Sequence, residues 1–144
     1  MSDYSKLSHT TWECKYHVVF IPKYRRKTIY GQIRKDLREV FHRLAYQKES
    51  KIEEGYLMKD HVHMLLSIPP KYSVSQVVGY MKGKSAIHIA QRYGNIRKNF
   101  VGQHFWARGY FVSTVGRDEN IIRQYIQNQE ATDKMLDQKS LFSN

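Results

Sequence analysis

Two histidines separated by a single residue, His61 and His63, have the types and spacing that could bind a metal ion. They lie in the run HVHMLLSI at residues 61–68. Because side chains of a strand alternate between its two faces, the histidines share one face and Val62 and Met64 take the other. Two imidazoles about 6.5 Å apart along a strand can hold one divalent cation when a third oxygen or nitrogen ligand joins them. A pair that only decorates a half-exposed strand is the alternative, and the pair alone does not decide between the two.

A tyrosine and a glutamine near the C-terminus form a second candidate pair. Tyr125 and Gln129 are four residues apart in a segment with a helical pattern, so they share one helix face. Ile122 and Ile126, also four apart, are expected to anchor a neighbouring face. A phenol can act as a nucleophile, but a boundary tyrosine with its hydroxyl in water has the same pattern. Other motifs are needed to decide whether Tyr125 is a nucleophile or a boundary residue.

Hydrophobic patterns predict the elements that position these residues. The first strand ends at a proline, and Ser73 and Gln76 have the spacing of a capping box at the start of the second helix. A turn at Lys59 and Asp60 joins the second and third strands, and shaping this turn is the favoured role of Asp60 over orienting a histidine. Asp118 is expected to cap the last helix. The predicted elements are strand 15–22, helix 31–48, strand 52–58, strand 61–68, helix 73–93, strand 109–115 and helix 118–136.

This order of strands and helices matches the split βαβ plan of ferredoxin-like domains. A length of 144 residues is that of one domain. We therefore expect an α+β, RRM-like βαββαβ sandwich over residues 1–144, with an added C-terminal helix at about 118–136 that carries Tyr125. Both main helices are expected to cover one face of the sheet, which leaves the other face for ligands and partners.

The charge of the chain favours a polyanionic partner. Lysine and arginine number 24 against 13 aspartate and glutamate residues, which gives a formal net charge of +11. Such an imbalance on one small domain indicates nucleic acid most simply. The single cysteine, Cys14, excludes an internal disulfide, and no segment has the pattern of a membrane span or a secretory signal. We expect a cytoplasmic, nucleoid-associated protein with no membrane partner.

Basic residues interleaved with aromatic ones are candidates for DNA contacts, because they can bind phosphates and stack on unpaired bases. The run KYRRK at residues 23–27 has this pattern. A basic surface loop that only aids solubility is the alternative, and Trp12 and Trp106 fit a core as well as a base stack. The candidates are Lys23, Tyr24, Arg25, Arg26, Lys27, Lys82, Lys84, Arg97, Lys98, Arg108 and Arg117.

Four motifs give the chain a specific pattern. They are YHVVFIPKYR at 16–25, KDHVHMLLSIP at 59–69, FWARGYFV at 105–112 and YIQNQ at 125–129. In this order and spacing the chain resembles the HUH single-tyrosine transposases of the smallest bacterial insertion sequences, the transposase A type. The likeness spans nearly the whole chain, and no single motif carries it alone.

That resemblance implies roles for residues of this chain. His61, His63 and Gln129 match the family's ligands for Mg²⁺ or Mn²⁺, and Tyr125 matches its nucleophile. The implied activity is metal-assisted cleavage and rejoining of single-stranded DNA at hairpin-bearing element ends, through a 5′-phosphotyrosine intermediate. The implied partners are single-stranded DNA with an imperfect hairpin and a second copy of the chain. Glu130 is an acidic alternative to Gln129, but a shift of one residue turns a helical side chain about 100° away from the Tyr125 face.

Other functions stay open on the sequence. A domesticated HUH nuclease would cut repetitive genomic hairpins without moving an element of its own. A non-catalytic module that binds single-stranded nucleic acid would share the ferredoxin-like plan, although such modules usually carry aromatic residues on the open sheet face instead of paired histidines. A replication initiator or relaxase of the HUH type would share the histidines and the tyrosine, but usually has further domains.

Overall fold

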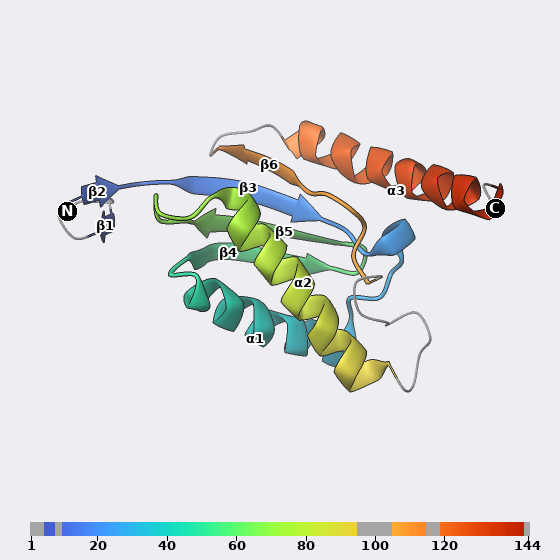
Figure 1. Cartoon of the computed structure of the whole chain (residues 1–144), viewed down its shortest axis with the longest axis horizontal. Coiled ribbons are helices and arrows are strands. Elements are labelled where there is room, and N and C mark those ends of the chain that lie inside the picture. Colours follow the sequence, from blue (N-terminus) through green and yellow to red (C-terminus); the bar gives the residue numbers. More distant parts are fainter. Residues whose placement is uncertain (1–4, 8–9, 95–104, 115–118, 143–144) are drawn as a thin grey trace.

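The computed structural model describes residues 5–7, 10–94, 105–114 and 119–142 (Figure 1). Its main sheet has four strands in the order β4-β5-β3-β6, and each neighbouring pair is antiparallel. This sheet order and the placing of the helices between the strands confirm the predicted ferredoxin-like plan. The strands are β3 (Lys15–Phe20), β4 (Lys51–Met58), β5 (His61–Ser67) and β6 (Phe111–Thr114).

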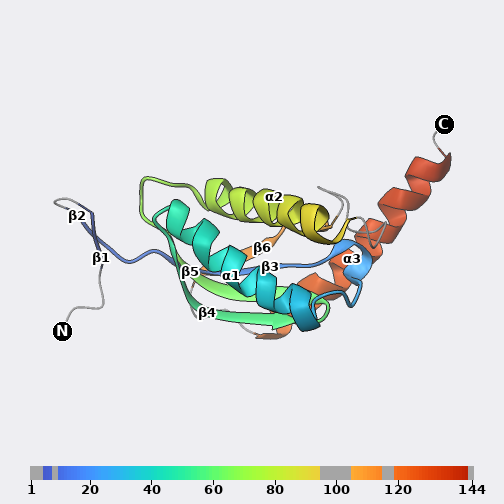
Figure 2. The same cartoon turned by 90° about the horizontal axis from the view of Figure 1, so that it is seen from below.

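Two helices, α1 (Gly31–Gln47) and α2 (Val74–Tyr93), cover one face of this sheet (Figure 2). Leu37 of α1 and Val77 of α2 are buried in the same core as Leu66 of the sheet. The helices bury these side chains because apolar residues recur along one face of each. In the part of the chain that the structure describes, no helix has the length and apolar composition needed to cross a membrane.

A third helix, α3 (Glu119–Phe142), packs on the opposite face. Successive residues of β3 point in opposite directions: Val18 lies in the core beneath α1 and α2, whereas Val19 lies in a smaller cluster with Ile21 and Ile126. Ile126 is therefore the anchor that its spacing predicts. The face expected to stay free is in fact partly covered, because α3 folds back across it.

Some boundaries differ from the predictions. β3 ends at Phe20, two positions before the expected end, and Pro22 makes only an isolated bridge with Trp106 because proline cannot donate to the ladder. α3 continues to Phe142 instead of ending near 136. The structure also has a hairpin that was not predicted, formed by β1 (Ser5–Leu7) and β2 (Thr10–Trp12), whose strands of three residues are too short for a readable pattern. Outside the described residues lie Arg97, Lys98, Arg117, Asp118 and the side chain of Ile122.

The basic run after β3 forms a short 3₁₀ turn, η1 (Lys23–Arg25). Tyr24 and Arg25 have φ angles of 62° and 52°, in the left-handed region that non-glycine residues seldom adopt. The amide N–H of Lys23 donates to the carbonyl of Phe105 at 2.9 Å, and the amide of Arg25 donates to the carbonyl of Pro22 at 2.8 Å. η1 also packs beside α3, where the amide N–H of Tyr24 donates to Asp133 at 3.3 Å.

Candidate functional site

The histidine pair lies on the sheet face opposite to α1 and α2. His61 and His63 are partly exposed, whereas Val62 and Met64 are buried among the residues that face the helices. The predicted alternation of β5 is therefore observed. In the ladder, His63 stands opposite Val19 of β3, the residue that faces α3.

An Asp60 oxygen fixes the orientation of the first imidazole. Oδ1 of Asp60 lies 2.8 Å from Nδ1 of His61. Since a carboxylate can only accept, Nδ1 of His61 is the donor, and in the neutral ring the lone pair is on Nε2. A histidine held in this way by a carboxylate is arranged as metal-binding histidines usually are. Asp60 therefore does both things considered for it, since it also forms the turn between β4 and β5.

The second imidazole belongs to a row of rings across three strands. Nε2 of His63 lies 3.1 Å from Nδ1 of His17 on β3, and the two ring centroids are 5.3 Å apart. On its other side, the Tyr56 ring of β4 lies 5.9 Å from the His63 ring. A bulge between Ile52 and Glu54 shifts the register of β4 and brings Tyr56 opposite His63. His17 was missed from the sequence, although it alternates with Val19 and so shares its face.

Tyr125 is half-buried on α3, with its ring 5.5 Å from that of Phe111. Its hydroxyl is buried and has no hydrogen-bond partner among the described residues. Burial raises the pKa of the Tyr125 phenol well above its ordinary value, and the negative charge of Asp133 adds to this effect. In this arrangement the phenol is neutral and not activated.

Gln129 and Asp133 share the helix face of Tyr125, because they follow it by four and eight residues. Nε2 of Gln129 donates to the carbonyl oxygen of Arg108 at 2.8 Å. Asp133 is fully buried, and its Oδ2 accepts the amide N–H of Tyr24 at 3.3 Å. Burial raises the pKa of the Asp133 carboxyl, although the positive charge of Lys23 opposes this. Asp133 was missed in the sequence analysis. The signal available there was its position, because it is a charged residue on the same side of the helix as Ile126.

Arg25 links the histidine-bearing hairpin to α3. Its Nε lies 3.4 Å from Oδ2 of Asp60 and 3.1 Å from Oε2 of Glu130. Glu130, considered above as a metal ligand, also pairs with Lys134 one turn later at 3.3 Å. The turn beside the histidines and the helix that carries Tyr125 are thus joined through one guanidinium.

The donor set fits a divalent metal only in part. Across the described ranges, no three His, Cys, Asp or Glu side chains gather as a metal site. His61 and His63 share a face with ring nitrogens suited to a cation, and Gln129 lies on α3 with its Nε2 bonded to the carbonyl of Arg108. The structure therefore places two of the three predicted ligands on one strand face and the third on the helix that packs against that face.

The other basic candidates differ in what they contact. Nζ of Lys82 donates to the carbonyls of Ala107 and Gly109 at 2.8 and 2.5 Å, and burial lowers the pKa of its ammonium group to about 8. The side chain of Lys82 thus holds the backbone on both sides of Arg108, whose own side chain is exposed. Lys23 and Arg26 lie near the Tyr24 ring at 5.8 and 5.1 Å, Lys84 lies 5.9 Å from the Tyr80 ring, Lys27 is exposed, and Trp106 is a core residue.

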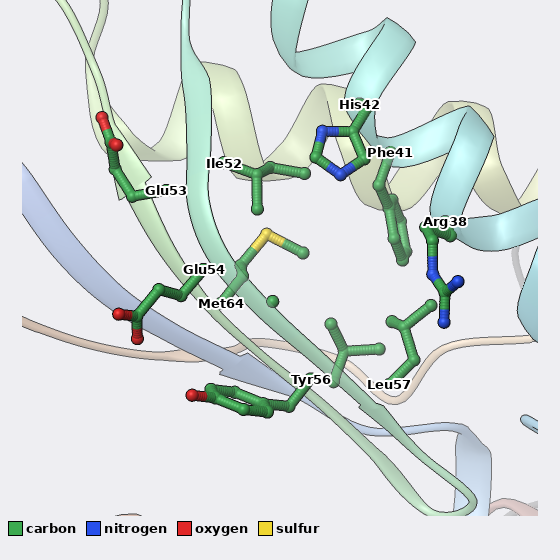
Figure 3. Close-up of a pocket in the computed structure, with 11 residues that line it drawn as sticks. Arg38, Phe41, His42, Ile52, Glu53, Glu54, Tyr56, Leu57 and Met64 are labelled. Atoms are coloured by element: carbon green, nitrogen blue, oxygen red, sulfur yellow. The ribbon is translucent and has the colours of Figure 1, made fainter.

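A hollow between α1 and β4 is separate from this site (Figure 3). Phe41 and His42 reach from α1 toward Met64 of the sheet, whereas Tyr56 points away from the helix. The floor of the hollow includes Val62 and Met64, which face away from the histidine pair. The hollow therefore lies on the other side of β5 from His61 and His63.

The sequence matches a known protein family over most of its length. Residues 10–129 match the family model described as "Transposase IS200 like". The transposase for insertion sequence element IS200 of Salmonella typhimurium is 44% identical over 141 residues, which cover 98% of this chain and 93% of that protein. The ISDra2 transposase TnpA of Deinococcus radiodurans is 28% identical over 119 residues, covering 82% of this chain and 85% of that protein.

Solved structures give the same picture of the fold. The crystal structure of a candidate transposase from Deinococcus radiodurans superposes with a TM-score of 0.78 at 26% identity, covering 87% of this chain and 97% of that one. A REP-associated tyrosine transposase bound to a REP hairpin gives a TM-score of 0.55 at 12% identity, covering 85% of this chain and 68% of that one. At that identity the second likeness concerns the fold alone.

Proposed function

The chain belongs to the IS200-like transposase family, and from this premise we propose that it cleaves and rejoins single-stranded DNA through Tyr125. The observation that carries the proposal is the shared sheet face, which holds the histidine pair and against which the Tyr125 helix packs. The substrate is the hairpin-bearing end of an insertion element. One solved structure with this fold, that of the REP-associated transposase, is bound to a hairpin.

The proposed reaction is a transesterification, in which the phosphate ester passes from a DNA 3′ oxygen to the tyrosine oxygen. Oη of Tyr125 attacks a backbone phosphorus, the bond from phosphorus to the 3′ oxygen breaks, and that oxygen leaves as a 3′-OH after taking a proton. The phenol proton passes to solvent. The product is a 5′-phosphotyrosine, and attack on it by a second 3′-OH restores a DNA bond and frees the tyrosine. No ATP is needed, because the covalent link conserves the broken bond.

His61, His63 and Gln129 are the proposed ligands of Mg²⁺ or Mn²⁺, with Asp60 orienting His61. Such an ion supplies positive charge to a non-bridging phosphate oxygen as negative charge develops there. Gln129 would bind through its amide oxygen, since its Nε2 donates to the carbonyl of Arg108. The Tyr125 hydroxyl must leave its buried position, since the neutral phenol that burial favours is a poor nucleophile.

The proposed DNA contacts come from residues around η1 and near α3. Arg26 and Arg108 have exposed side chains and can reach phosphates directly. Tyr24 and the cations stacked near its ring offer a surface for an unpaired base. The proposed role of Lys82 is indirect, because its side chain bonds the backbone carbonyls on both sides of Arg108. Lys23, Lys84 and Arg117 complete the proposed DNA set. The proposed protein partner is a second copy of the chain.

Labelled single-stranded oligonucleotides that tile both flanks of the gene test the proposal. Each is incubated with the protein and Mg²⁺, Mn²⁺ or a chelator, and then separated on a denaturing gel. The wild type and Tyr46→Phe, which changes a tyrosine that is 81% exposed on α1, should give a metal-dependent shifted band, and Tyr125→Phe should not. Oligonucleotides that bind without any adduct would favour the non-catalytic binding module instead.

A further inference from the structure

Arg25 occupies a position between three separate segments. Its guanidinium is within ion-pair distance of Asp60 on the hairpin turn and of Glu130 on α3. All three side chains are mostly buried, with relative exposures of 29%, 25% and 27%. Charged pairs that are partly shielded from water interact more strongly than fully exposed ones. Arg25 is therefore already ion-paired, unlike a solvent-exposed basic residue that is available to bind a phosphate.

The backbone under Arg25 is itself held in place. Tyr24 and Arg25 both have left-handed φ angles, which persist only where the surroundings fix them. The amide of Tyr24 is bonded to Asp133 of α3, and the amide of Arg25 is bonded to Pro22. The direction of the Arg25 side chain is thus set by the segment between β3 and η1 and by α3 together.

One partner of Arg25 contacts a residue of the proposed site, and the other lies on the helix that carries Tyr125. The Asp60 carboxylate uses Oδ2 for Arg25 and Oδ1 for Nδ1 of His61. Glu130 is the next residue after Gln129 and lies five positions beyond Tyr125 on α3. The guanidinium is therefore connected to His61 through Asp60 and to the helix of the nucleophile through Glu130.

We propose that Arg25 is a positioning residue that sets the tyrosine helix in register with the histidine pair, and is not a simple phosphate contact. The inference rests on the proposed function. An arginine suits this role because its planar guanidinium presents several donors and can serve two carboxylates at once, whereas a lysine offers a point charge. Loss of Arg25 would leave Asp60 free to turn away from His61 and would leave Glu130 paired with Lys134 of its own helix.

A double-mutant cycle tests the coupling. The variants are Arg25→Gln, Glu130→Gln and the two combined, with Arg26→Gln as the control for loss of a neighbouring positive charge. Single-turnover adduct formation is measured at saturating oligonucleotide over a range of Mn²⁺ concentrations, and oligonucleotide affinity is measured separately. Arg25→Gln should slow adduct formation about tenfold and raise the Mn²⁺ concentration for half-maximal rate. Its effect on affinity should be no larger than that of Arg26→Gln.

The double-mutant cycle can either support or overturn the proposed coupling between Arg25 and Glu130. Because Arg25 and Glu130 act as a unit, the double variant should be no slower than Arg25→Gln alone. Additive losses would overturn the coupling, and an Arg25→Gln variant with lower affinity but an unchanged saturated rate would show a phosphate contact. Arg25→Lys, with its melting temperature as a check on folding, should recover part of the rate, and full recovery would contradict the need for a guanidinium. A wild type that forms no adduct would overturn the proposed function itself, and this inference with it.

Discussion

The buried carboxylate of Asp133 accepts a hydrogen bond from the backbone N–H of Tyr24, a residue 109 positions earlier in the chain. This bond ties the helix of the proposed nucleophile to the strained turn after β3. Tyr125 shares one helix face with Asp133, and its hydroxyl is buried without a hydrogen-bond partner among the described residues. α3 is docked by polar groups as well as by the apolar side chain of Ile126.

Removal of the Asp133 carboxylate should destabilise the docked helix. Asp133→Ala leaves the amide of Tyr24 without its acceptor, which should lower the free energy of unfolding by about 1–3 kcal/mol. Asp133→Asn keeps an acceptor oxygen and should lose less. Urea denaturation of the wild type and both variants measures the difference. Equal losses for Ala and Asn would mean that the hydrogen bond to Tyr24 is not what Asp133 contributes.

Lys82 should give the protein a characteristic dependence of stability on pH. Burial lowers its pKa from 10.5 to about 8, so the folded state releases this proton before the unfolded state does. Between these pH values the unfolded state binds more protons, and stability therefore rises with pH. The stability advantage of the wild type over Lys82→Met should widen from pH 8 to pH 10, as measured by chemical denaturation. Lys84→Met, which changes an exposed neighbour on α2, should show no such widening.

Substitution of either histidine of the pair should remove activity without unfolding the chain. His61 and His63 are partly exposed on the sheet, so alanine at either position should change stability by no more than about 1 kcal/mol. Metal-dependent adduct formation should fall below detection in both variants. His42→Ala is the control, since His42 is exposed on α1, away from the site. A large drop in melting temperature for His61→Ala would indicate a structural histidine instead.

Binding of single-stranded DNA should weaken steeply as salt is raised. A chain with a formal net charge of +11 that contacts several phosphates releases counterions on binding. Arg26→Gln should reduce the slope of log affinity against log salt by about one unit if Arg26 contacts a phosphate. Fluorescence anisotropy at a series of salt concentrations gives this slope. A flat response of the wild type would contradict phosphate contacts altogether.

Local patterns were enough to predict the order of the elements and the face of the histidine pair. Alternation in HVHMLLSI and the capping box at Ser73 depend only on neighbours in sequence, and both are observed. The paired positions of Tyr125 and Gln129 on one helix face follow in the same way. The ferredoxin-like plan then follows from the order of strands and helices.

Contacts between distant segments could not be predicted. The pairing of Arg25 with Asp60 and Glu130 depends on how α3 docks, which no local pattern encodes. The contact between His17 and His63 depends on the register of β3 against β5, and the position of Tyr56 depends on a bulge. Basic residues within one run read alike in sequence, yet Arg25 is ion-paired whereas Lys27 is exposed.

The central claim, that Tyr125 is the residue joined to DNA, can be tested by mapping the adduct. The wild-type protein is reacted with a cleavable oligonucleotide and a divalent metal, trimmed with nuclease and protease, and analysed by mass spectrometry. The account predicts a nucleotide attached through its 5′-phosphate to the peptide that contains Tyr125, both in the wild type and in Tyr46→Phe. A nucleotide on any other residue, or an adduct that persists in Tyr125→Phe, would contradict it.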